Sequence, residues 1–160
     1  AVGIGLVLAS LSFMKKMGDV THEMSEVAPV QKEKASNDEK LLSSEFLSKV
    51  FIKHIEGPLF FGFTSDFQAL SKQLPDSAKV VIIRMERVPL IDQSGLFALE
   101  DILIELTQKG ITPFLEGVRE QPEYMMQTIG ILNELIPEEH QFSDFESCRL
   151  WLTENLDRFH

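Results

Sequence analysis

The sequence is poor in the residues on which several classes of protein depend. Its single cysteine, Cys148, can form neither an internal disulfide nor a cysteine-rich zinc site. Basic residues are few: 15 Lys and Arg stand against 25 Asp and Glu, and the net charge of −10 disfavours binding to nucleic acid. The four histidines are scattered along the chain, so they predict neither a catalytic histidine nor a metal cluster. We therefore expect no metal and no cofactor.

The N-terminal apolar run is too short to cross a membrane in full. Residues 1–14 are uncharged and are followed by Lys15 and Lys16, whereas a complete crossing needs about 20 residues. Basic residues after an apolar run mark the cytoplasmic end of a membrane helix, while a signal peptide carries them before it. We interpret residues 1–17 as the end of a transmembrane helix that begins upstream. The alternative is a buried or amphipathic N-terminal helix.

The rest of the chain divides into a linker and a domain. Residues 18–45 are polar and lack apolar periodicity, which is typical of a linker. From residue 46 to residue 160, strand-like and helix-like segments alternate. The composition is that of a globular protein, with 44% apolar and 25% charged residues. The pattern predicts one compact α/β domain with a partly parallel sheet and helices packed against it.

Several segments of this domain can be assigned. Residues 79–85 include four consecutive apolar residues and predict a strand that is buried on both faces at the centre of the sheet. Leucines at helical spacing predict a helix over residues 94–109. Short strands at residues 50–55 and 59–63 flank a turn and are expected to pair as a hairpin. A further helix opens at Gln121 and is expected to bury Tyr124, Met125 and Ile129. Ser143 is expected to cap the last helix in a capping box.

The loop after the central strand holds the most informative polar residues. Loops at the carboxyl ends of strands are where α/β proteins form sites. Here Asp92 or Ser94 can cap the next helix, with Gln93 between them and Gly95 allowing close packing. The functional alternatives are an anion site at the helix N-terminus and phosphorylation of Ser94. A serine hydrolase would need a base near Ser94, and the surrounding residues do not form the Gly-x-Ser-x-Gly elbow.

Phenylalanines dominate the short strand at residues 59–63. The sequence LFFGF contains Phe60 and Phe61 side by side and Phe63 after a glycine. Phenylalanines in a short strand are expected to contribute to the core on one side and to an interface on the other. A surface that stacks on a cofactor is the alternative.

Two segments together point to a family. They are IEGPLFFG at residues 55–62 and DQSG at residues 92–95. With them, residues 47–156 resemble the STAS domain at the carboxyl end of SulP-family inorganic anion transporters, the sulfate permeases. The apolar run that ends in lysines strengthens the resemblance, because the soluble members of the wider superfamily lack it.

The resemblance implies a STAS-type mixed sheet on the cytoplasmic side of the plasma membrane, and no enzymatic activity. The domain would regulate and assemble a dimeric secondary transporter for sulfate, bicarbonate or carboxylates, with the membrane domain of the same transporter as its partner. A cytoplasmic protein or a nucleotide would be a further ligand of the loop at residues 92–95. In soluble anti-sigma-factor antagonists a kinase phosphorylates the serine that corresponds to Ser94. A free-standing regulator of that kind is the alternative function.

Overall fold

The computed structural model describes residues 2–5, 7–9, 11–12, 27–29, 48–60 and 64–159. Within them, five strands form one sheet in the order β1-β2-β3-β4-β5. Their bounds are β1 Val27–Pro29, β2 Val50–Glu56, β3 Val80–Arg87, β4 Thr112–Glu116 and β5 Gln141–Phe142. Strand β1 pairs antiparallel with β2, and the remaining neighbours pair in parallel. The sheet is therefore mixed, as the sequence predicts.

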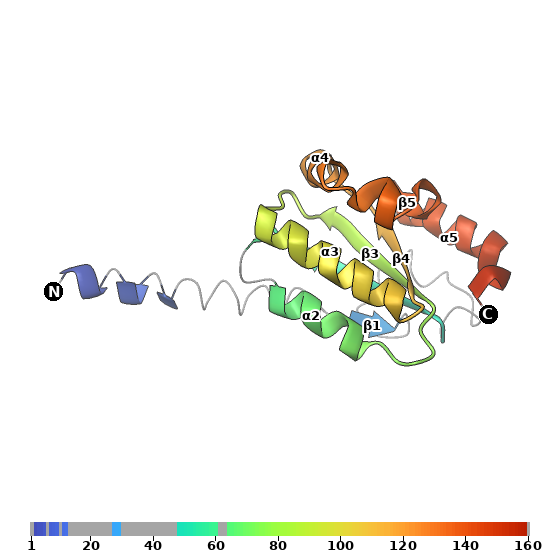
Figure 1. The fold of residues 1–160 in the computed structure, drawn as a ribbon, viewed down its shortest axis with the longest axis horizontal. Coiled ribbons are helices and arrows are strands. Elements are labelled where there is room, and N and C mark those ends of the chain that lie inside the picture. Colours follow the sequence, from blue (N-terminus) through green and yellow to red (C-terminus); the bar gives the residue numbers. More distant parts are fainter. Residues whose placement is uncertain are drawn as a thin grey trace.

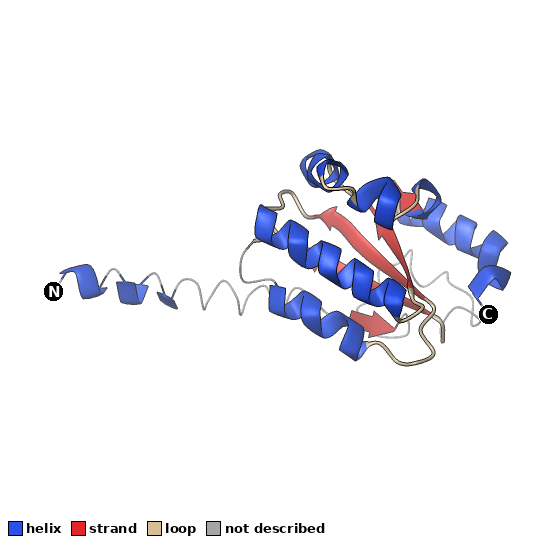
Figure 2. Cartoon of the chain, in the orientation of Figure 1, coloured by secondary structure: helices blue, strands red, loops and turns tan. Residues whose placement is uncertain are grey.

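Three helices lie on one face of this sheet, and a fourth covers the other (Figure 1). Helix α2 (Thr64–Gln73) and helix α3 (Gln93–Gln108) lie side by side across the first face (Figure 2). Helix α4 (Glu120–Thr128) follows β4 on the same face, whereas helix α5 (Phe145–Asn155) packs on the opposite one. The strand order follows the chain order, so each right-handed crossover turns in the same direction and places its helix on the same side.

Strand β3 is the centre of the core, as predicted. Val81 and Ile83 point toward α2 and α3, whereas Val80 and Ile82 point toward α5. All four side chains are almost completely buried. Alternate residues of one strand thus contribute to two apolar clusters, which is why its sequence shows a continuous apolar run and no alternation with polar residues.

The predicted hairpin is wrong. Both edges of β2 are occupied, one by β1 and the other by β3, so β2 has no free edge for a strand that folds back. Gly57, with φ of +85°, turns the chain, and its N–H donates to the carbonyl of Arg87. The chain then continues alongside the segment that follows β3, where Leu59 forms a parallel bridge with Ile91. Phe61 and Phe63 lie outside the described residues.

Two details of the helices also differ from expectation. Helix α4 includes Pro122 in its first turn, as predicted, but it buries Pro122 and Met126 and leaves Tyr124 exposed. Met125 and Ile129 are partly buried and pack against the core as expected, so the prediction is wrong for Tyr124 alone. In α5 the capping residue is Asp144, because its Oδ1 accepts the backbone N–H of Ser147 at 2.8 Å. The carboxylate of Asp144 thus takes the capping place that was predicted for the hydroxyl of Ser143.

Residues 2–12 are helical at each position that the structure describes. The apolar side chains there are exposed, namely Val2, Ile4, Val7, Leu8 and Leu11. Among the described residues, no helix combines the length and the apolar character that a membrane crossing requires. The interpretation of residues 1–17 as the end of a transmembrane helix stays a prediction.

An aromatic cluster fastens the carboxyl end of the chain to the α5 face of the sheet. His140 stacks on Phe114 with ring centroids 4.6 Å apart, and the edge of Trp151 closes the other side at 5.5 Å. Phe142 and Phe159 complete the cluster. Burial lowers the pKa of His140 below its ordinary value of 6.5, although Glu139 beside it acts in the opposite direction.

This burial predicts a dependence of stability on pH. Below pH 6.5 the unfolded chain binds a proton at His140 more readily than the folded chain does. The free energy of unfolding should therefore fall as the pH drops below that value, and it should be independent of this histidine above it. Urea unfolding at pH about 7.5 and about 5.5 measures the effect. His140→Gln should show a smaller loss between the two pH values, and an equal loss in both proteins would contradict the assignment.

Candidate functional site

The loop over residues 88–92 joins β3 to α3 and ends in a capped helix N-terminus. Asp92 is the cap: its backbone is extended, with φ of −90° and ψ of 175°, and its Oδ1 accepts the N–H of Gly95 at 2.7 Å. Of the two capping residues that the sequence allowed, the structure selects Asp92. Ser94 is then the second residue of the helix and is half-buried, while Gln93 is exposed.

Gly95 lies against the backbone of Leu59. A β-carbon at Gly95 would lie 2.6 Å from the carbonyl oxygen of Leu59 and 3.0 Å from its carbonyl carbon. Such an approach is possible only for a residue without a side chain. The close packing that the sequence suggested for Gly95 is therefore confirmed, and its partner is now identified.

Hydrogen bonds fix Leu59 to the loop in the manner of a parallel strand pair. The N–H of Leu59 donates to the carbonyl of Leu90 at 3.0 Å, and the carbonyl of Leu59 accepts the N–H of Asp92 at 2.9 Å. The segments at residues 55–62 and 92–95 are about thirty residues apart in the sequence. They meet in the structure where Leu59 pairs with the loop and contacts Gly95. Sequence reasoning found both segments but could not predict their contact.

Three large apolar side chains on the segments that meet here are exposed. Phe60 is 40% exposed, Leu90 is 50% exposed and Phe97 is 47% exposed. Phe60 follows Leu59, Leu90 is its hydrogen-bonding partner, and Phe97 lies one helical turn beyond Ser94. We call Phe60, Leu90 and Phe97 the apolar rim. Large exposed apolar residues that gather around one loop are typical of a surface that contacts a partner.

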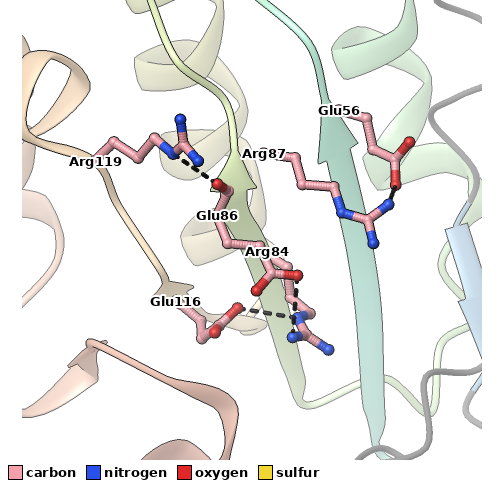
Figure 3. Close-up of polar contacts among 6 residues, drawn as sticks. All are labelled: Glu56, Arg84, Glu86, Arg87, Glu116 and Arg119. Atoms are coloured by element: carbon pink, nitrogen blue, oxygen red, sulfur yellow. Dashed lines mark hydrogen bonds and ion pairs between the residues drawn. The ribbon is translucent and has the colours of Figure 1, made fainter.

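A cluster of charged residues lies at the carboxyl ends of β2, β3 and β4 (Figure 3). Its buried part is the pair of Arg84 and Glu116, in which Nε and Oε2 are 3.0 Å apart and the side chains are 5% and 2% exposed. The guanidinium of Arg84 also contacts Glu86 and lies over the ring of Phe145 at 4.9 Å. Sequence reasoning missed this pair. The feature of the sequence that could have revealed this pair is Arg84 itself, a charged residue within β3, the most buried strand.

Neither of the histidines that the structure describes lies on the same face of the sheet as Ser94. The described histidines, His54 and His140, lie on the α5 face of the sheet, opposite α3 and Ser94. Burial raises the pKa of the Cys148 thiol, so that residue stays protonated and unreactive. The order of the described strands does not reverse, so this sheet has no switch point of the kind at which α/β sheets bind nucleotides.

Comparisons with known proteins agree with this description. The family model for the STAS domain matches residues 42–147. The crystal structure of a sulfate transporter family protein from Wolinella succinogenes superposes with a TM-score of 0.66 at 25% identity, over 76% of this chain and 96% of that one. The STAS domain of a SulP transporter from Vibrio cholerae gives a TM-score of 0.61 at 20% identity, over 73% and 88%.

A longer relative shares the fold as well. The murine anion transporter Solute Carrier 26 family member A9 superposes with a TM-score of 0.66 at 17% identity. The match covers 96% of this chain but 25% of the murine transporter. No curated protein matches the chain. Because the family model covers more than half of the sequence, the chain belongs to the STAS domain family.

Proposed function

We propose that this chain is the cytoplasmic regulatory and assembly domain of a SulP-type secondary anion transporter. The observation that carries the proposal is the STAS fold together with the contact between its two characteristic segments, at Leu59 and Gly95. The structural match to a sulfate transporter family protein and the exposed apolar residues at positions 2–11 support it. In this proposal, residues 1–17 end the last transmembrane helix and residues 18–45 form the linker, from which β1 adds an edge strand to the sheet. Residues 46–160 form the rest of the domain.

The proposed mechanism places the loop at residues 92–95 and the apolar rim against the membrane domain of the transporter, beneath the plasma membrane. The rim supplies apolar area, and the capped end of α3 supplies a defined backbone geometry. The transporter would be a homodimer that moves sulfate, bicarbonate or carboxylates. Its anion specificity belongs to the membrane part, where the ends of broken helices usually hold the substrate.

Ser94 is the residue through which this surface can be modified. A phosphate there would add nearly two negative charges to the first turn of α3, whose next turn carries the exposed Phe97. The positive end of α3 would partly stabilise these charges. The apolar rim, however, would lose its fit to an apolar partner. Phosphorylation would therefore change the contact more than it changes the fold of the domain.

Ser94→Glu in the parent transporter tests this mechanism. We expect a change of at least about twofold in the initial rate of anion uptake, with the melting temperature of the domain shifted by only a few degrees, because a charge at a helix N-terminus contributes less than about 1 kcal/mol. Uptake into proteoliposomes at matched protein density measures the rate. The control is Ser77→Glu, which places the same charge at an exposed turn between α2 and β3. Equal uptake by Ser94→Glu, Ser77→Glu and the unmodified transporter would count against a regulatory role of the loop.

The parent protein itself can be tested independently. The proposal expects the coding sequence upstream of Ala1 to encode further apolar segments of about 20 residues each. A reading frame that starts near Ala1 would contradict the transporter, whatever the result of the uptake assay.

A further inference from the structure

The first turn of α4 holds the loop at residues 88–92 through side chains. Gln121 contacts the backbone of Ile91 twice: its Oε1 accepts the N–H of Ile91 at 2.9 Å, and its Nε2 donates to the carbonyl of Ile91 at 3.1 Å. Two residues earlier, Nε of Arg119 donates to the carbonyl of Glu86 at 2.8 Å (Figure 3). The start of α4 is thus bonded to the end of β3 and to the last part of the loop that follows it.

The contact with Gln121 reproduces the pairing of a strand. Leu59 pairs with Leu90 and Asp92, so the backbone groups of Ile91, which lies between them, point away from Leu59. In a continuing sheet, β4 would accept that pairing, but β4 ends at Glu116. The primary amide of Gln121 has the same donor and acceptor as a peptide group. It therefore supplies the pairing that a strand residue would otherwise provide.

We propose that Gln121 is a positioning residue that couples α4 to the candidate site. Ile91 is held between Leu59 on one side and Gln121 on the other, and Asp92, the next residue, caps α3 and leads to Ser94. A displacement of the first turn of α4 would release Ile91 and alter the helix cap. The outer side of α4, with Tyr124 68% exposed, is accessible to a partner that causes such a displacement. This inference rests on the proposed function for its consequence in transport, but its structural part is tested separately.

The test is amide hydrogen exchange of the 160-residue chain in detergent, with NMR as the readout of each amide. In Gln121→Met, which keeps the length of the side chain and removes both hydrogen bonds, the amide of Ile91 should exchange about five- to tenfold faster. The amides of Asp92 and Gly95 should also exchange faster, while those of Leu103 and Leu106 in the same helix should not change. Gln127→Met is the matched control, because Gln127 is an exposed glutamine of α4 whose amide does not contact the loop.

Gln121→Glu separates positioning from a general loss of stability. A protonated carboxyl has one donor and one acceptor, as the amide does, whereas a carboxylate would face the carbonyl of Ile91 without a donor. The Gly95 resonance of Gln121→Glu is compared with that of the unmodified chain at each pH. The difference should be small near pH 4 and should grow as the pH rises through the pKa of the new carboxyl, about 4.3 in the absence of neighbours. Taking the difference at each pH removes the response of Gly95 to the carboxylates that both proteins share, such as the acceptor of its own N–H.

Several results would overturn the inference. Unchanged exchange of Ile91 in Gln121→Met would do so, and so would faster exchange at Ile91 without any change at Gly95. If Gln121→Met loosened all amides equally, the Gly95 resonance of Gln121→Glu would decide. A difference from the unmodified chain that does not change with pH would refute the coupling. These readouts do not depend on transport, so an uptake assay in which Ser94→Glu has no effect would contradict the proposed function alone.

Discussion

Arg84→Met is expected to destabilise the domain by about 3–5 kcal/mol, because it leaves the carboxylate of Glu116 buried without its main partner. Met keeps the unbranched apolar stem of arginine and removes the guanidinium, so the packing of the stem is retained while the charge and its contact with the ring of Phe145 are lost. Glu116 is 2% exposed and cannot recover its hydration by a small movement. The midpoint of urea unfolding, converted with the slope of the transition, measures the loss.

Two further variants show whether this loss is due to the unpaired charge. Arg84→Met combined with Glu116→Met removes both charges and should restore most of the stability, since paired replacement of a buried ion pair by apolar residues is often neutral or stabilising. Arg87→Met is the matched control on the same strand, because Arg87 pairs with Glu56 at the surface and is 65% exposed. It should change the free energy of unfolding by less than about 1 kcal/mol. Equal losses in Arg84→Met and Arg87→Met would show that the buried pair contributes no more to the free energy of unfolding than the exposed pair does.

The parts of the fold that sequence reasoning could predict are those set by local patterns. The stripe of leucines in α3 follows from a period of 3.6 residues, and Leu96, Leu99, Leu103 and Leu106 are all buried. The central position of β3 follows from its apolar run. In both cases the burial of each side chain is fixed by its neighbours along the chain, so the sequence contains the information.

The parts that it could not predict depend on contacts between distant segments. The turn at Gly57 was interpreted as a hairpin, although the chain pairs there with a segment thirty residues later. The pairing of β1 with β2 involves residues before the domain in a polar stretch that gives no strand signal. The partners of Arg84 and of Gln121 become visible only when β3, β4 and α4 are placed side by side. Such contacts decide the geometry of the candidate site.

The candidate site illustrates both cases. The DQSG segment predicts a capped helix, and the structure provides it, with Asp92 as the cap. The reason for the glycine, however, is the backbone of Leu59, which belongs to the other segment. Neither segment alone explains why both occur in one sequence. Their contact does, because the apolar rim combines Phe60 of the first segment with Leu90 and Phe97, which flank the second.

Gly95→Ala tests this contact through the sign of its effect. Within a helix, alanine is normally more stable than glycine by about 0.5–1 kcal/mol. Here the new β-carbon would lie 2.6 Å from the carbonyl oxygen of Leu59, which is a backbone atom bonded to the N–H of Asp92 and cannot rotate away. We therefore expect a loss of about 1–3 kcal/mol, as for an overpacked core. Thermal and urea unfolding measure the loss, and the amide resonances of Leu59 and Asp92 report its location.

Gln93→Ala is the matched control, since it introduces the same residue at an exposed position two residues earlier in the same helix. Its effect should lie within about 0.5 kcal/mol of zero. Destabilisation by Gly95→Ala together with a neutral Gln93→Ala would place the constraint at the contact with Leu59 and not in the helix itself. If Gly95→Ala stabilised the domain, α3 and Leu59 would not approach as described. The two segments would then contribute to the function separately, and the surface formed by the apolar rim would have to be assigned again.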